Sequence, residues 1–252
     1  MSKIISVATQ KGGVGKTTTT CGLAAALKHK GYKVLVVDMD PQSNLSFSMG
    51  ADTESATIYN VLKGEVKTQF AIQRSTVVDT IATNILLSGI ELEFTSTGRE
   101  FLLAKVLEPI ADIYDYIIID SPPGLGILTV NALAASNYVI LPMMSDIFSL
   151  QGITQIYETV EHLKRTCNSK LEIAGILLTR FNPRTKLAKE VLGTAELVSQ
   201  SLNIPIFKTY IRSCISLSEA QALQCDMFEY ARYSTGVLDY ESLLSELKER
   251  GI

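Results

Sequence analysis

The sequence has no apolar run long enough to cross a membrane and no cysteine spacing typical of a metal site. Its longest apolar runs, such as residues 117–119 and 176–178, fall far short of the ~20 residues of a spanning helix. Its four cysteines are scattered, and its two histidines are isolated from each other. The N-terminus leads directly into an apolar strand pattern instead of a signal peptide. These absences predict reduced thiols and a soluble, cytoplasmic protein.

The chain also has little net charge and no sign of a linker. Its 252 residues carry a formal net charge of −3, and 46% of them are hydrophobic. A chain of this length can bury roughly 70–75% of its unfolded surface, which is enough for one large domain. No Pro- or Ser-rich spacer, internal repeat or low-complexity run divides it. We therefore expect a single domain over residues 1–252, on which any nucleic-acid site would be a local basic patch.

One short segment, Gln-Lys-Gly-Gly-Val-Gly-Lys-Thr-Thr at residues 10–18, predicts a phosphate-binding loop. It follows an apolar strand pattern and precedes a helical one, so its glycines can turn successive amide groups toward one anion. In such a loop Lys16 meets the β- and γ-phosphates, Thr17 is a ligand of Mg²⁺ and Thr18 donates to the α-phosphate. A flexible turn beside a capped helix is the alternative. The candidate nucleotide contacts of the loop are Lys11, Gly12, Gly13, Val14, Gly15, Lys16, Thr17 and Thr18.

Three aspartates follow apolar strand patterns in a similar way. Asp38 and Asp40 come after residues 34–37, and Asp120 follows residues 116–119. An aspartate at the end of an apolar strand is the Walker B arrangement, in which a carboxylate supports the Mg²⁺ shell. We therefore assign Asp38 and Asp120, together with the threonine of the loop, to the metal. A helix cap or a turn is the alternative role for any one of these aspartates.

Apolar segments alternate with helical patterns along the chain, which predicts an α/β fold of the P-loop NTPase type. The expected strands are residues 4–8, 33–38, 84–87, 116–120, 138–142, 172–179 and 204–207. The expected helices are residues 16–30, 100–110, 125–135, 149–167, 185–202 and 236–248. Near-continuous Val, Ile and Leu in the strands is typical of a mostly parallel sheet with helices on both faces. Ligands of such sheets bind beyond the carboxyl ends of the strands, where the phosphate loop lies.

The loop departs from the general phosphate-loop pattern, because Gln10 replaces its first glycine and Lys11 follows. Lys-Gly-Gly-Val-Gly-Lys-Thr-Thr resembles the deviant Walker A loop of the ParA and MinD superfamily of ATPases. This resemblance implies that Lys11 reaches across a dimer interface to the partner's nucleotide. It also implies that Asp40, within Asp-Met-Asp-Pro-Gln, orients the attacking water during slow, Mg²⁺-dependent hydrolysis of ATP, with Lys11 and Lys16 at the same site. An ordinary solvated lysine is the alternative for Lys11.

Segments beyond these motifs resemble the ParA-type partition ATPases in particular. They are residues 128–135, 150–152, 175–181 and 217–220, so the similarity spans the whole chain. It implies an ATP-dependent sandwich dimer that coats nonspecific DNA, and a ParB-type centromere-binding partner that stimulates hydrolysis. It also adds Phe181 and Asn182 as candidate nucleotide contacts. Because the chain starts at its first strand, we expect no N-terminal DNA-binding extension, and we expect association with the nucleoid in the ATP-bound state.

Basic residues suited to DNA contact are few and local. The candidates lie around the start of the helix expected at residues 185–202, and they are Arg180, Arg184, Lys186 and Lys189. Arg184 matches a position implicated in DNA contact in the family. Ordinary solvated helix charge is the alternative for all four.

A further candidate lies where the sequence departs from the family. Two arginines that the family commonly carries fall here on Ser213 and Ser216, and Arg212 stands in place of a proline. Arg212 either supplies the missing positive charge or is an ordinary surface residue. The family's later Gly-Lys-Pro is replaced by Gln-Cys-Asp at residues 224–226, in a segment expected near the nucleotide base.

A MinD-like ATPase that acts on membranes or positions another cargo is the competing function. It shares the loop and the dimer but needs a basic amphipathic C-terminal helix. Residues 240–250 have an apolar stripe of Leu243, Leu244 and Leu247, yet their acidic residues outnumber the basic ones. We therefore expect this helix to dock on its own domain, without stable membrane association. A reductase with a shared iron-sulfur cluster would need paired cysteines, which the sequence lacks.

Overall fold

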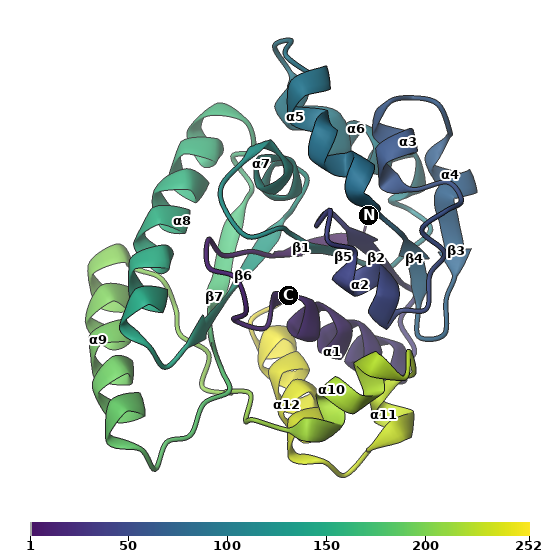
Figure 1. Ribbon diagram of the computed structural model, residues 1–252. Helices are drawn as coiled ribbons and strands as arrows, with labels where there is room; N and C mark the ends of the chain where they lie inside the picture. Colours follow the sequence, from purple (N-terminus) through teal and green to yellow (C-terminus); the bar gives the residue numbers. More distant parts are fainter. Residues whose placement is uncertain (1) are drawn as a thin grey trace.

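A seven-stranded sheet forms the centre of the protein, in the order β3-β4-β2-β5-β1-β6-β7 (Figure 1). The computed structural model describes residues 2–252, apart from the side chains of residues 147 and 148. The strands are β1 (Lys3–Val7), β2 (Val34–Asp38), β3 (Ile72–Arg74), β4 (Asp79–Ile81), β5 (Tyr116–Asp120), β6 (Tyr138–Met144) and β7 (Glu172–Thr179). Neighbouring strands run parallel, except that β3 pairs antiparallel with β4. The expected α/β fold with a mostly parallel sheet is confirmed.

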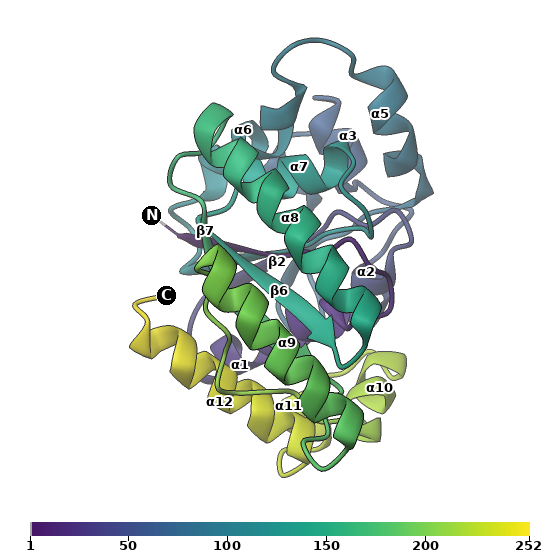
Figure 2. The ribbon, with the colours of Figure 1, turned by 90° about the vertical axis from the view of Figure 1, so that its left-hand side faces the viewer.

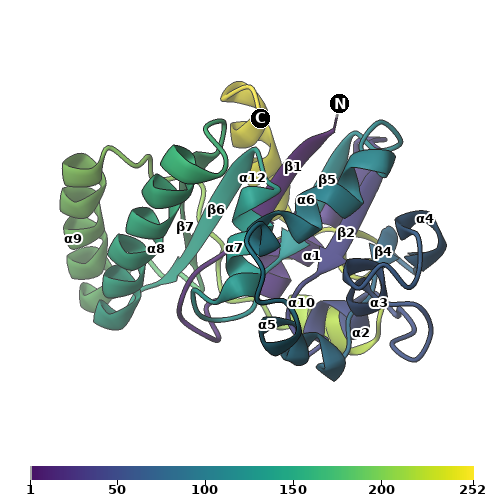
Figure 3. The ribbon, with the colours of Figure 1, turned by 90° about the horizontal axis from the view of Figure 1, so that it is seen from above.

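Helices cover both faces of this sheet, which is why its central strands are apolar over their whole length. Every residue of β2 and β5 is buried. Below the sheet in Figure 1 lie α1 and α12, while α6 and α7 lie above it and α8 lies on its left. The view from above in Figure 3 shows α6, α7 and α8 over the same face of the sheet. Figure 2 shows α9 packed beside α8. These helices are α1 (Lys16–His29), α6 (Leu102–Leu107), α7 (Ile127–Ala134), α8 (Ile147–Thr166), α9 (Lys186–Leu202) and α12 (Thr235–Glu249).

Six shorter helices occupy the connections, and the sequence pattern did not predict them. They are α2 (Asn44–Ser48), α3 (Ile58–Leu62), α4 (Thr68–Ala71), α5 (Ile90–Glu93), α10 (Ile215–Ala222) and α11 (Met227–Tyr230). Each spans at most eight residues, which is too short for a 3.6-residue periodicity to be recognised. Two of them, α2 and α10, matter for function because they border the cavity described below.

The C-terminal helix α12 packs against α1, as expected. Its apolar stripe, including Tyr240, Leu243, Leu244 and Leu247, is buried in the same core cluster as the helix that carries the phosphate loop. No helix in the described part of the chain is long and apolar enough to cross a bilayer. The stripe is therefore already used within the domain.

The expected strand at residues 84–87 is wrong. The side chain of Asn84 accepts a hydrogen bond from the backbone N–H of Leu86, and a 3₁₀ helix, η1 (Ile85–Gly89), begins there. The edge of the sheet is formed instead by β4 and β3, which lie earlier in the chain. The apolar run Ile-Leu-Leu at 85–87 therefore belongs to a helical turn in which only Leu87 is buried.

The other corrections concern residues 204–207 and 100–110. The expected strand at 204–207 forms an isolated bridge to β7 between Ile206 and Ile176. The next bridge to β7 joins Ile211 to Thr179 and lies beyond the expected range. The expected helix at 100–110 is interrupted, because α6 covers its middle and 3₁₀ turns flank it as η2 (Arg99–Phe101) and η3 (Glu108–Ile110). Pro109 lies in the second turn, where a missing amide hydrogen prevents a regular α-helical bond.

Candidate nucleotide-binding site

The phosphate loop joins β1 to α1 and leaves the first turn of α1 open to a ligand. Gly13 and Gly15 have φ angles of 74° and 89°, in the left-handed region that favours glycine. No side chain in the described residues caps α1, so its first amide groups remain available as donors. Thr179, at the end of β7, donates a 2.7 Å hydrogen bond to the carbonyl of Val14 and holds the loop in place. The loop is thus shaped for an anion before one binds.

Lys16 lies beneath this loop, between backbone and carboxylate oxygens. Its side chain is buried, and Nζ donates a 3.2 Å hydrogen bond to the carbonyl of Lys11. Burial lowers the pKa of Lys16, while the negative charges of Asp120 and Asp40 act in the opposite direction. An added phosphate would supply a further negative charge and so favour the ammonium form.

Thr17 and Asp120 form the candidate Mg²⁺ site at the end of β5. Thr17 Oγ1 donates a 2.6 Å hydrogen bond to Asp120 Oδ2, and Thr20 Oγ1 lies 3.4 Å from Oδ1. Asp120 is fully buried, and burial, followed by the charge of Asp38, raises its pKa to about 8. A buried carboxylate of this kind is stabilised by an added cation.

The chemistry of these groups fits Mg²⁺ bound together with a nucleotide. Among the described residues, no three His, Cys, Asp or Glu side chains cluster into a cage for a metal ion. Mg²⁺ usually keeps several waters and takes only one or two carboxylates plus substrate phosphates. A hydroxyl and a carboxylate beside a phosphate loop therefore suffice.

Asp38 turns away from this point. It pairs in register with Asp120 on the neighbouring strand, but its carboxylate is fully buried and faces α2. It accepts hydrogen bonds from Ser46 N at 2.8 Å, from Ser46 Oγ at 2.7 Å and from Asp40 N at 3.0 Å. Burial raises its pKa to about 6. In this structure Asp38 fixes the Asp40 loop against α2, and its assignment to the metal stays a prediction.

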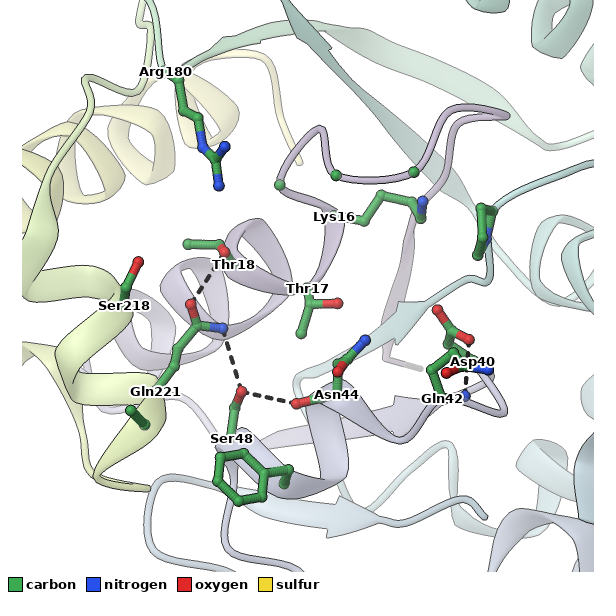
Figure 4. Close-up of a pocket in the computed structure, with 16 residues that line it drawn as sticks. Lys16, Thr17, Thr18, Asp40, Gln42, Asn44, Ser48, Arg180, Ser218 and Gln221 are labelled. Carbon is green, nitrogen blue, oxygen red and sulfur yellow. Dashed lines mark hydrogen bonds between the residues drawn. The ribbon is translucent and has the colours of Figure 1, made fainter. Parts of the chain in front are cut away.

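Asp40 lies across a cavity of about 510 Å³ from the phosphate loop (Figure 4). Its Oδ1 accepts a 3.0 Å hydrogen bond from Gln42 N, which orients the carboxylate. The lining comes from the phosphate loop, the Asp40 loop with α2, the loop after β5, the end of β7 and α10. Its residues are Gly12, Gly13, Gly15, Lys16, Thr17, Thr18, Asp40, Gln42, Asn44, Phe47, Ser48, Pro123, Arg180, Ser218, Gln221 and Ala222. The structure thus brings most of the expected nucleotide contacts to one cavity.

Two further lining residues, Gln221 and Ser48, connect the loop to α10 and α2. Thr18 Oγ1 donates a 3.1 Å hydrogen bond to Gln221 Oε1, and Gln221 Nε2 donates to Ser48 Oγ at 3.3 Å (Figure 4). No sequence motif marked either residue, because 203 positions separate Thr18 from Gln221.

Arg180 is another lining residue, which the sequence suggested only as a basic residue for DNA contact. It follows the last residue of β7 and has a φ of 49°, a left-handed conformation that is uncommon for a residue other than glycine. It borders both the main cavity and a second one of about 490 Å³, which also touches Gly15, Thr18 and Ser218. Figure 4 shows its guanidinium pointing toward the phosphate loop. Backbone strain of this kind often marks functional positions.

Lys11, the additional lysine of the loop, does not line the cavity. Its Nζ lies 2.6 Å from Asp146 Oδ1, in an ion pair whose side chains are 35% and 28% exposed. Asp146 lies between β6 and α8. In this structure Lys11 therefore contacts its own chain.

Three other expected nucleotide contacts, Val14, Phe181 and Asn182, do not line the cavity. Phe181 is buried, and its ring meets the edge of Tyr210 at 5.0 Å between centroids. Asn182 is exposed, and its side chain accepts a hydrogen bond from Arg184 N just before α9. Neither residue lines the cavity, whereas their neighbour Arg180 does. A nucleotide contact by these two side chains stays a prediction.

The expected DNA-binding residues fall into two environments. Arg184, Lys186 and Lys189 are exposed around the start of α9. Arg212 instead donates from Nε and NH2 to the carboxylate of Asp239 on α12, with a shortest distance of 2.6 Å. The Arg212 side chain is still 43% exposed. Arg212 therefore has a partner of opposite charge within the domain, and its contact with DNA stays a prediction.

Comparisons with known proteins agree with this site. A family model described as an AAA domain matches residues 2–173. The sporulation initiation inhibitor protein Soj of Bacillus subtilis is 39% identical over 257 residues, which cover all of both chains. The chromosome partitioning protein ParA of Myxococcus xanthus is 36% identical over 99% of this chain and 89% of its own.

A solved structure repeats the fold over the full length. Cobyrinic acid a,c-diamide synthase from Mycobacterium smegmatis, solved with a bound ATP analog and magnesium, superposes with a TM-score of 0.88. The two proteins are 31% identical, and the match covers 100% of this chain and 96% of the other.

Proposed function

This chain belongs to the Soj and ParA family of partition ATPases, and we propose that it is a nucleotide-dependent dimer that acts in DNA segregation. It is a P-loop ATPase whose cofactors are ATP and Mg²⁺. The observation that best supports the proposal is the convergence of Lys16, Asp40 and Asp120 on one side of a loop that also carries Lys11.

Hydrolysis in this site depends on positioning and charge neutralisation more than on a strong base. The loop amides and Lys16 hold the phosphates, and Thr17 with Asp120 would hold Mg²⁺, which neutralises charge on the phosphate oxygens. Asp40, oriented by its bond from Gln42 N, accepts a hydrogen bond from the attacking water. Turnover is slow until a partner of the ParB type completes or stabilises the reactive arrangement.

The dimer would place Lys11 of each copy against the nucleotide of the other. Sedimentation velocity with ATP, with ADP and without nucleotide tests this. We expect dimers with ATP alone, and we expect Lys11→Ala to abolish them, because the cross-interface ammonium is lost. Lys170→Ala, at an exposed lysine on the turn before β7, is the matched control. Equal dimer formation by wild type and Lys11→Ala would remove the cross-interface role.

The DNA half of the proposal is supported by the exposed basic residues at the start of α9. A net charge of −3 makes any DNA contact local and sensitive to salt. Cosedimentation with DNA and ATP should weaken with salt by about 0.9 log units per phosphate contact and per log unit of salt. Neutralising Arg184, Lys186 and Lys189 with glutamine should lower that slope, whereas Lys105→Gln on α6 should not. Absence of ATP-dependent DNA retention at low salt would exclude the proposed DNA binding.

A MinD-like membrane function is less compatible with the packing of α12. Leu243, Leu244 and Leu247 are buried against the domain, so a membrane contact would require the helix to undock. Cosedimentation with anionic liposomes and ATP, run beside the cosedimentation with DNA, tests this alternative. Retention on liposomes without retention on DNA would favour this alternative.

A further inference from the structure

We propose that a cavity at the amino ends of β2 and β4 binds a small organic anion with a flat aromatic body. We call it the amino-edge cavity, and its lining includes Val34, Arg74 and Tyr114. Its volume is about 440 Å³, compared with about 510 Å³ for the nucleotide cavity. Volumes of about 300–1,000 Å³ are typical of small-molecule sites. The amino-edge cavity is therefore large enough for a ligand, and the ATPase reaction proposed above does not use it.

The amino-edge cavity lies at the edge of the sheet opposite the phosphate loop. Val34 is the first residue of β2 and Asp79 is the first residue of β4, while Arg74 ends β3, which runs antiparallel to β4. The phosphate loop instead follows the carboxyl end of β1, which runs in the same direction as β2 and β4. The two cavities share no residue in the described part of the chain. A ligand in the amino-edge cavity thus leaves the nucleotide site open.

The walls of the amino-edge cavity are apolar. Three valines that are at most 8% exposed contribute to them, namely Val34, Val77 and Val78. Two tyrosines also line the cavity, and the hydroxyls of both are engaged elsewhere: that of Tyr32 accepts a 2.8 Å hydrogen bond from Lys248 Nζ, and that of Tyr114 donates one of 2.8 Å to Asp79 Oδ2. Because these polar atoms already have partners, a nucleotide base would leave much of its hydrogen-bonding capacity unpaired here. An aromatic hydrocarbon fits such walls better.

Two cations at the rim favour a ligand of negative charge. Lys33 and Arg74 line the cavity and are exposed, and neither side chain forms an ion pair or hydrogen bond with any of the described residues. Lys28 also lines the cavity, but its Nζ lies 2.9 Å from the buried carboxylate of Asp226. One acid, Asp79, opposes the two cations, and the tyrosine wall already donates to its carboxylate. An anionic group on an aromatic body therefore matches both the rim and the walls.

The strength of the expected preference follows from the exposure of the two cations. An ion pair at an exposed side chain changes an affinity by roughly two- to fivefold. Loss of both cations should therefore weaken the binding of an anion by about 4- to 25-fold. The apolar walls act equally on charged and uncharged ligands, so an uncharged ligand of the same shape should bind as before.

Two fluorescent probes of nearly the same shape test the site. Anilinonaphthalene sulfonate is an aromatic anion, and phenylnaphthylamine has the same ring system without the sulfonate. Each probe is titrated into the full chain with saturating ADP and Mg²⁺, so that the nucleotide cavity is filled. We expect the double variant Lys33→Gln/Arg74→Gln to bind the sulfonate about 4- to 25-fold more weakly than the wild type, and to bind the uncharged amine with the same affinity.

Two further variants separate this site from general effects of charge and apolar surface. Lys105→Gln/Lys170→Gln also removes two exposed cations, but away from the cavity, so it should bind both probes as the wild type does. Ile113→Ser removes a lining side chain that is 52% exposed, and it should weaken the binding of both probes.

Three results would overturn the proposal. They are equal sulfonate affinity in wild type and Lys33→Gln/Arg74→Gln, an equal loss in the control with two lysine substitutions, and an equal loss of both probes in Lys33→Gln/Arg74→Gln. Each of these results leaves the ATPase assignment standing, because the nucleotide cavity is occupied throughout.

Discussion

Replacing Gly22 with alanine should push α1 and α12 apart where Gly22 faces the ring of Tyr240. A Cβ atom at this position would lie 2.4, 2.5 and 2.6 Å from three ring atoms of Tyr240. Since ordinary contacts begin near 3.4 Å, the ring would have to retreat by about 1 Å. Tyr240 is 1% exposed, so there is no free space for it to enter.

The net effect on stability is the difference between two opposing terms. Overpacking of a core typically costs 1–3 kcal/mol, and three simultaneous clashes place Gly22→Ala at or above the upper end. Alanine is a better helix former than glycine by about 1 kcal/mol, which offsets part of that cost. We therefore expect a loss of about 2 kcal/mol, or a fall in Tm of roughly 4–8 °C for a chain of this size.

The matched control is Gly193→Ala in the interior of α9. A Cβ atom there meets nothing within 4 Å, so only the helix-propensity gain of about 0.5–1 kcal/mol remains. Urea unfolding of the nucleotide-free protein, followed by circular dichroism, measures both changes. The two substitutions should shift the midpoint in opposite directions. A shift of both in the same direction would refute the clash argument.

Three further predictions concern the site. Asp40→Ala should still bind ATP but release phosphate at least ~100-fold more slowly, because the attacking water loses its positioning group; turnover at the wild-type rate would refute this. Burial raises the pKa of Asp120 to about 8, above the unfolded value of about 3.9, so the metal-free protein should lose stability as the pH rises between these values. Urea unfolding at about pH 5.5 and pH 8.5 should show this fall, and Asp120→Asn should flatten it; equal slopes in both proteins would contradict the assignment. Arg180→Gln should weaken ATP binding by about tenfold in calorimetry, by loss of a charged donor at the cavity, whereas Arg184→Gln should leave it unchanged. Equal affinities of both variants would rule out the Arg180 contact.

The sequence could predict those site residues that lie close to a recognisable strand or helix pattern. Lys16, Thr17 and Asp120 each lie at a fixed offset from an apolar strand, and parallel strands bring such offsets to one edge of the sheet. Lys16 and Thr17 therefore line the cavity as expected, and Asp120 accepts a hydrogen bond from Thr17. The Lys11–Asp146 pair could not be predicted in this way, because its partners are 135 positions apart and meet only through the packing of α8.

The wrong strands have a similar cause. Residues 84–87 and 204–207 are apolar, and apolarity alone does not distinguish a strand from a helical turn or a covering segment. In the first case the cap by Asn84 decides for a helix. In the second, backbone pairing with Ile176 stops after one residue. The orientation of Asp38 likewise depends on Ser46, whose helix is too short to be recognised from its pattern.

A hydrogen-bonded chain runs from Thr18 of the phosphate loop through Gln221 to Ser48, so the Thr18 hydroxyl is bound to a side chain of α10. If the Thr18 hydroxyl donates to a phosphate, its hydrogen bond to Gln221 Oε1 is lost. The Gln221 amide must then find a new donor, which also affects its bond to Ser48. Ligand binding to the loop should therefore alter contacts in two helices that are far apart in the sequence, α2 and α10. Amide hydrogen exchange rates in α2 and α10, measured with and without nucleotide, would detect this change.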